Sequence, residues 1–103
     1  MAILIIRSAI RTSPYEADAA VLHDGRILLA SDASEKMAED LDRQIKMYRE
    51  MIADDNGKPA TGDELLEGVA SRWNNQVVQS RIFSDDEVDE AEKYLKESGM
   101  NYF

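Results

Sequence analysis

The side chains that could do chemistry in this chain are almost all carboxylates. Its 103 residues include 21 Asp and Glu, one histidine and no cysteine. One histidine cannot form a histidine metal cluster, and without cysteine there is no thiolate ligand, thiol nucleophile or disulfide. A catalytic triad would have to recruit His23, which the sequence places beside a turn. We therefore expect no enzyme activity, no metal site and no cofactor.

These carboxylates are concentrated in two segments. Residues 32–57 hold eight acids and four bases, and residues 84–103 hold seven acids and two bases, whereas the rest is neutral. In the first segment, Glu39–Arg43 and Asp42–Lys46 are spaced to form ion pairs along a helix. The net charge of −9 disfavours direct binding to nucleic acid or an anionic membrane, because phosphates are bound by clustered Lys and Arg. A basic protein surface is the complementary partner.

The candidate site is the acidic face of a helix expected over residues 84–98, together with one methionine. Six acids there point away from an apolar stripe, and Met47 lies on the charged face of another helix, where it has no core role. The predicted partner-binding residues are Asp85, Asp86, Asp89, Glu90, Glu92, Glu97 and Met47. The alternative is a purely solvated face, since acids in the first turn also stabilise a helix through its dipole.

The stretch 17–30 predicts the scaffold that positions these helices. Asp24 and Gly25 separate two apolar runs, which is typical of a hairpin with a two-residue type I′ loop. In that register Leu22 pairs with Ile27, and apolar side chains lie on both faces of the hairpin. Helices, or another subunit, must then cover both faces.

The remaining elements follow from periodicity and capping. An amphipathic helix begins near Ser34 and ends before a loop that starts at Asp54. Residues 76–83 are either an edge strand or part of the second helix, and we favour the helix, continuing to about Gln79. The strands expected are 2–11, 15–22 and 26–30, and capping boxes at Thr61–Glu64 and Ser84–Glu87 begin the second and third helices.

We therefore expect an α+β fold with a small three-stranded antiparallel sheet and three α-helices, a fourth strand at 76–83 being the alternative to helix there. A single domain over residues 1–103 would combine a β unit (1–31) and a helical part (32–103). No apolar run approaches the roughly 20 residues of a membrane span, and no signal peptide is evident. The expected location is the cytoplasm.

Composition and charge favour a non-enzymatic acidic protein that docks on a basic protein surface. Small, acidic, cysteine-free domains occur among phage and mobile-element inhibitors, including anti-CRISPR and anti-restriction proteins that mimic DNA on a host nucleic-acid enzyme. This analogy rests on size and charge, and no motif supports it. The alternative is a structural assembly or adaptor module that homo- or hetero-oligomerises through its sheet, for example as a homodimer.

Overall fold

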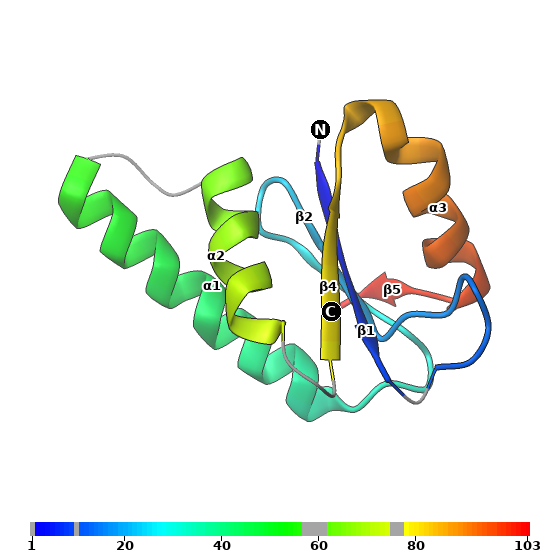
Figure 1. Cartoon of the computed structure of the whole chain (residues 1–103). Coiled ribbons are helices and arrows are strands. Elements are labelled where there is room, and N and C mark those ends of the chain that lie inside the picture. The colour runs from blue at the N-terminus through cyan, green and yellow to red at the C-terminus, as the bar shows by residue number, and fades with distance from the viewer. Residues whose placement is uncertain (1, 10, 57–61, 75–77) are drawn as a thin grey trace.

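One antiparallel sheet of five strands runs through the middle of the molecule, between helical layers (Figure 1). The computed structural model describes residues 2–9, 11–56, 62–74 and 78–103, and only the backbone of residues 52–56. The strands are β1 (Ile3–Ser8), β2 (Ala19–Leu22), β3 (Ile27–Leu29), β4 (Val78–Phe83) and β5 (Asn101–Tyr102), in the order β4-β1-β2-β3-β5. The helices are α1 (Glu35–Asn56), α2 (Asp63–Trp73) and α3 (Val88–Glu97), with a short 3-10 helix, η1 (Asp85–Glu87), leading into α3. The predicted α+β class is confirmed, but the sheet has five strands and not three or four.

Both faces of the sheet are apolar, as the hairpin sequence predicts, and helices of the same chain lie over each face. On one face Leu4 packs with Leu41 of α1 and Leu66 of α2, all completely buried. On the other face Ile5 packs in a second cluster with Ala91 of α3. Figure 1 shows α1 and α2 on one side of the sheet and α3 on the other. The acids of α3 therefore belong to a different layer from those of α1.

The β2–β3 hairpin closes with a three-residue loop, so the predicted two-residue type I′ turn is wrong. The Leu22 N–H donates to the Arg26 carbonyl (2.8 Å), and the Gly25 N–H donates to the Leu22 carbonyl (2.9 Å). A type I′ turn needs two residues at positive φ, whereas in this loop Gly25 alone has one, at 91°. Asp24 instead accepts a hydrogen bond from the Arg26 backbone N–H (3.1 Å) and pairs with its guanidinium (2.7 Å). These contacts hold the longer loop.

The extra loop residue shifts the strand pairing by one position. Val21, and not the predicted Leu22, pairs with Ile27. Because side chains alternate along a strand, Val21 and Ile27 face α1 and α2, whereas Leu22 and Leu28 face α3. The predicted assignment, with Leu22 and Ile27 on the same face, is therefore also wrong.

β4 is an edge strand, so the preferred prediction of a helix continuing to Gln79 is wrong and the alternative is right. α2 ends at Trp73, and Asn74 has extended backbone angles (φ −75°, ψ 107°). The Asn74 side-chain oxygen accepts hydrogen bonds from the Ser80 backbone N–H (2.8 Å) and hydroxyl (2.9 Å). Asparagine favours such local bonds over continued helix, and here it ties the end of α2 to β4.

The fifth strand comes from the residues that follow α3, where the expected three-stranded sheet includes no strand. Tyr102 lies opposite Leu28, and the Phe103 N–H donates to the Ile27 carbonyl (3.0 Å). This docking uses the backbone, since the side chains of Tyr102 and Phe103 remain 63% and 60% exposed. The segment 32–103, expected to be helical, thus supplies both edge strands of the sheet.

Of the two predicted capping boxes, the structure confirms the second. The Ser84–Glu87 capping box forms and begins η1. Thr61 of the other predicted box lies outside the described residues, and the residue capping α2 is Gly62, at φ 67°. α1 runs on to Asn56, past its predicted end.

No helix in the described residues is long and apolar enough to cross a membrane.

Candidate functional site

The six acids predicted to bind a partner lie on η1 and α3, and the capping box fixes where they point. The Glu87 carboxylate accepts hydrogen bonds from the Ser84 N–H (3.3 Å) and hydroxyl (3.2 Å), and it pairs with Arg81 of β4 (2.7 Å). Ala91 is buried against the sheet, which turns the acids outward. The acidic surface, as we call it, consists of Asp85, Asp86, Asp89, Glu90, Glu92 and Glu97, all exposed except the half-buried Glu90.

Most acids of this surface form no salt bridge with the described residues of the protein. Among the residues that the structure describes, no Lys or Arg forms a salt bridge with Asp86, Asp89, Glu92 or Glu97. On the acid-rich α1, two acids are paired. Asp42 pairs with Lys46 (2.9 Å) as predicted, while Arg43 pairs with Asp40 (3.3 Å) and not with Glu39. The charge of the acidic surface is thus largely uncompensated.

The two lysines of α3 compensate little of this negative charge. Lys93 and Lys96 lie on the same helix as the acids and are exposed. The Lys93 ammonium lies 5.3 Å from the centre of the Tyr15 ring, a cation–π contact that directs it towards the segment before β2. The sequence of η1 and α3 still holds seven acids against these two lysines.

Met47, the seventh predicted residue, is not part of the acidic surface. It lies on α1, on the opposite side of the sheet from α3, and is 40% exposed. Met51, one turn later, is 49% exposed. The structure therefore does not bring Met47 together with the six acids.

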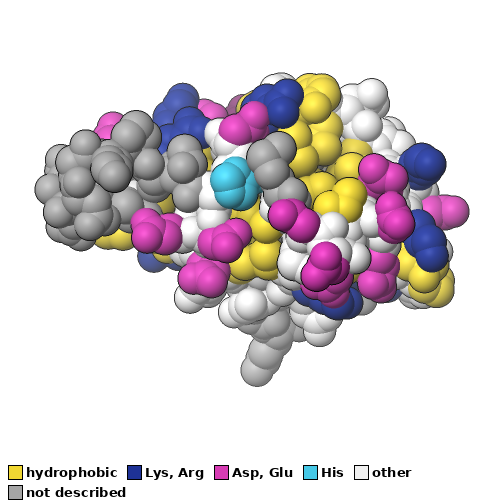
Figure 2. Space-filling view, turned by 90° about the horizontal axis from the view of Figure 1, so that it is seen from above, with side chains coloured by type: hydrophobic (Ala, Val, Ile, Leu, Met, Phe, Trp, Pro, Cys, Tyr) yellow, Lys and Arg dark blue, Asp and Glu magenta, His cyan; other side chains and the backbone are white. Residues whose placement is uncertain are grey.

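An apolar recess adjoins the acidic surface. Its volume is about 210 Å³, and its lining residues are Ala2, Ile3, Leu22, His23, Asp24, Arg26 and Val88. Val88 is the first residue of α3, so the recess begins where the acids begin. Figure 2 looks down on this end of the molecule and shows hydrophobic side chains between the histidine and several acids. Sequence reasoning missed the recess because its residues come from distant parts of the chain.

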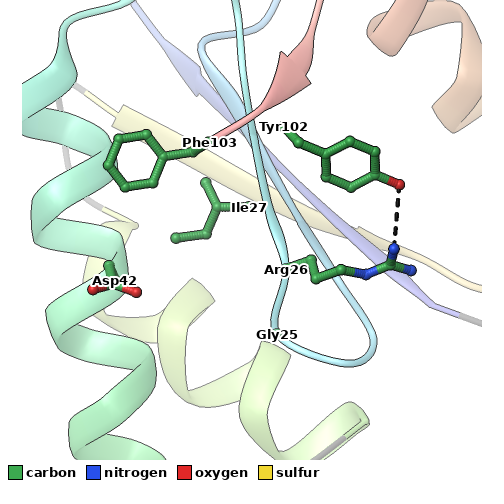
Figure 3. A pocket seen from close by; sticks show the side chains of 6 residues that line it. All are labelled: Gly25, Arg26, Ile27, Asp42, Tyr102 and Phe103. Atoms are coloured by element: carbon green, nitrogen blue, oxygen red, sulfur yellow. Dashed lines mark hydrogen bonds between the residues drawn. The ribbon is translucent and has the colours of Figure 1, made fainter.

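A wider pocket of about 430 Å³ lies between α1 and the strands β3 and β5 (Figure 3). In this view Phe103 points towards α1, whereas Tyr102 points to the other side, where its hydroxyl lies 3.5 Å from the Arg26 guanidinium. Both charged groups that line the pocket are already paired, Arg26 with Asp24 and Asp42 with Lys46. This pocket therefore offers exposed aromatic rings and no uncompensated charge.

His23 has structural contacts in the hairpin loop. Its carbonyl accepts a hydrogen bond from the Gly62 N–H (2.9 Å) at the start of α2. Its imidazole lies against Gly62, where the Cβ of any other residue would collide with it. Arg49 of α1 donates a hydrogen bond to the Asp24 carbonyl of the same loop. The loop thus joins both helices of that layer to the sheet.

Two carboxyl groups beside the acidic surface have lowered pKa values. The Ser84 backbone N–H, followed by the Ser84 hydroxyl and then Arg81, lowers the pKa of Glu87. The Arg26 backbone N–H, assisted by its guanidinium charge, lowers the pKa of Asp24. Both groups stay ionised at mildly acidic pH. Within the described residues no cluster of His, Asp or Glu is placed to hold a metal ion.

Comparison with known proteins assigns no family to this chain. No protein-family model matches it, and no curated protein or solved structure shows significant similarity to it. Its function must be argued from the surfaces described above.

Proposed function

We propose that this protein is a non-enzymatic binding protein that docks its acidic surface on a basic surface of another protein. The observation that carries the proposal is a group of four exposed acids without salt bridges in the described part of the chain: Asp86, Asp89, Glu92 and Glu97. Glu97 lies in the last turn of α3, where the helix dipole disfavours negative charge. A basic partner would supply the missing counter-charge.

The partner class that we propose is a protein whose basic surface binds nucleic acid. Such a surface receives closely spaced negative charges, and an acidic protein seated on it would compete with nucleic acid. This is the mode of action of a DNA-mimic inhibitor, and it keeps the analogy with anti-restriction and anti-CRISPR proteins. The net charge of −9 would also accelerate association with such a partner at low salt.

The apolar recess adds a second, directional contact to this docking. An aliphatic or aromatic side chain of the partner, flanked by Lys or Arg, would enter the recess while its basic neighbours reach the acids. An apolar anchor inside a polar rim is the usual layout of a specific protein interface. Charge alone would give weaker selectivity among basic proteins.

The test compares two variants that lose the same charge. The docking variant is D86N/D89N/E92Q/E97Q, and the matched control is E39Q/E50Q/E64Q/E67Q. All eight acids are exposed and form no salt bridge in the described residues. Each protein is immobilised and incubated with a bacterial lysate, and the retained proteins are released with salt or with duplex DNA.

We expect a nucleic-acid-binding protein that the wild type and the control retain and the docking variant does not, with at least about tenfold weaker binding for the docking variant. The partner should elute with about 0.5 M salt, which shortens the Debye length to a few ångströms. Equal retention by both variants, or release by neither salt nor DNA, would contradict docking through the acidic surface.

A second candidate is the assembly module, and the exposed aromatic side chains on β5 are the observation in its favour. Tyr102 and Phe103 present rings at an edge of the sheet, where another strand could add. The other edge is less suited, since Asn74 already occupies the Ser80 N–H of β4. This candidate predicts a dimer whose mass by light scattering falls to that of a monomer in Y102S/F103S. A monomeric wild type at micromolar concentration would rule out the homodimer.

A further inference from the structure

We propose that a cavity on the α3 side of the sheet binds a small carboxylate attached to a flat apolar group. The cavity has a volume of about 160 Å³, and its lining residues are Ile5, Arg7, Gln79, Ser80, Arg81, Phe83 and Tyr94. It lies between α3 and the strands β1 and β4, and it shares no residue with the apolar recess or with the pocket in Figure 3. In this acidic protein, the cavity has two arginines and no carboxylate in its lining.

Arg7 is held in place without being neutralised. Its guanidinium donates hydrogen bonds to the carbonyl oxygens of Pro14 (3.1 Å) and Arg11 (3.0 Å). Both acceptors are uncharged, and no carboxylate of the described residues forms a salt bridge with Arg7. A half-buried cation in a chain of net charge −9 would ordinarily attract one of the surplus acids. Here the positive charge is oriented and left available.

Arg81 supplies a second guanidinium at the same cavity. It lies opposite Ile5 on β1, which makes it a diagonal neighbour of Arg7 on the same face of the sheet. Its guanidinium carbon lies 4.5 Å from the centre of the Phe83 ring, and one terminal nitrogen pairs with Glu87 (2.7 Å). A guanidinium has five N–H donors in a planar fork, so further donors remain for a carboxylate.

The rest of the lining selects an apolar body for the ligand. Ile5 and Phe83 are 3% and 1% exposed, and the Tyr94 ring lies 5.6 Å from that of Phe83. The volume is well below the roughly 300–1,000 Å³ of ordinary ligand pockets, so a single ring is about the largest group that fits. Paired guanidinium forks favour a planar carboxylate over a rounder anion. We expect affinities on the order of millimolar for such a fragment.

Benzoate is the probe, and amide chemical shifts in ¹H–¹⁵N NMR spectra of the whole chain are the measurement. Saturable shifts should appear at Ile5, Phe83 and Tyr94. Benzamide, which has the same shape without the charge, and inorganic phosphate, which has charge without the ring, should each bind at least about tenfold more weakly. The first variant is Arg81→Gln, at an exposed site, and we expect it to bind benzoate about tenfold more weakly or worse.

Arg43→Gln is the matched control, because it removes one exposed arginine on α1, in the other layer, and should leave benzoate binding unchanged. Arg7→Gln should also lose binding, and its spectrum shows whether the fold survives the loss of two carbonyl contacts. Equal binding of benzamide or phosphate would overturn the ligand class. No saturable shift with benzoate, or full binding by Arg81→Gln, would overturn the site. Neither result depends on the acidic surface, so the docking proposal is tested separately.

Discussion

The Arg11 side chain joins two segments that are far from it along the sequence. Its guanidinium donates to Asp18 through Nε (3.1 Å) and Nη2 (2.8 Å), and to Asp32 through Nη1 (2.7 Å). Asp18 is 6% exposed and also accepts the Ser8 N–H (2.5 Å). Hydrogen bonds to Asp32 and Asp18 raise the pKa of Arg11, and the bond from Arg11 lowers the pKa of Asp32. The sequence suggests a strand as far as Arg11, but β1 ends at Ser8, and the Arg11 side chain bridges the residue before β2 and the turn before α1.

Arg11→Gln should lower the free energy of unfolding by about 3 kcal/mol, because it leaves the Asp18 carboxylate buried without a cation. Urea denaturation at neutral pH measures the change. Asp32→Asn removes the exposed partner, whose side chain is 64% exposed, and should cost much less. Similar losses of stability in the two variants would show that the buried Arg11–Asp18 pair contributes no more than the exposed Arg11–Asp32 pair.

Glu87 predicts a pH dependence of stability. Its pKa is lower in the folded protein, chiefly through the Ser84 N–H, so its contribution is present above the unfolded pKa and is lost as pH falls through the folded value. The stability difference between wild type and Glu87→Gln should therefore be largest at neutral pH and shrink below about pH 4. Urea denaturation across this range measures it. A pH-independent difference between wild type and Glu87→Gln would contradict the linkage.

At the scale of elements, the sequence predicts well what local chemistry decides. The apolar stripe of α1 and the Ser84–Glu87 capping box depend on neighbouring residues, and both are present in the structure. β4 and β5 depend on partners far along the chain, and periodicity does not reveal such partners. The hairpin was recognised but its register was not, because one residue of loop length decides the register and Asp24 stabilises the longer loop.

Gly25→Ala tests this loop. At φ 91° a Cβ is strained, and it would also displace the Arg49 guanidinium and its hydrogen bond to the Asp24 carbonyl. We expect a loss of about 2 kcal/mol in unfolding free energy. Gly99→Ala, at φ 60° with only ordinary contacts to Ser31, should lose about 1 kcal/mol. In an Arg49→Ala background, the loss of unfolding free energy caused by Gly25→Ala should fall to that caused by Gly99→Ala. An unchanged loss would exclude a collision between the added Cβ and the Arg49 guanidinium.

At the scale of the whole molecule, charge is divided between the two helical layers. The sequence locates the excess acids in two segments and predicts ion pairs along α1, where Asp40 and Asp42 are paired, but it does not show that Asp86, Asp89, Glu92 and Glu97 form no salt bridge in the described residues. It also does not show the apolar recess or the arginine cavity, because each is assembled from residues that only the fold brings together. A surface that keeps unpaired acids close together, with Glu97 at the unfavourable end of the helix, gives up stability that pairing would restore.

The unfolding free energy of the variant E92Q/E97Q measures this loss of stability directly. Glu97 lies in the last turn of α3, so neutralising it relieves repulsion from the helix dipole, and neutralising both acids relieves repulsion from the other surplus acids. We expect the free energy of unfolding to rise by about 0.5–1 kcal/mol at about 10 mM salt, and the gain to shrink at about 0.5 M, where screening already weakens the repulsion. E39Q/E50Q, on the interior turns of α1, should gain less. A loss of stability in E92Q/E97Q would mean that these acids serve the fold, and the docking proposal would then lack its main support.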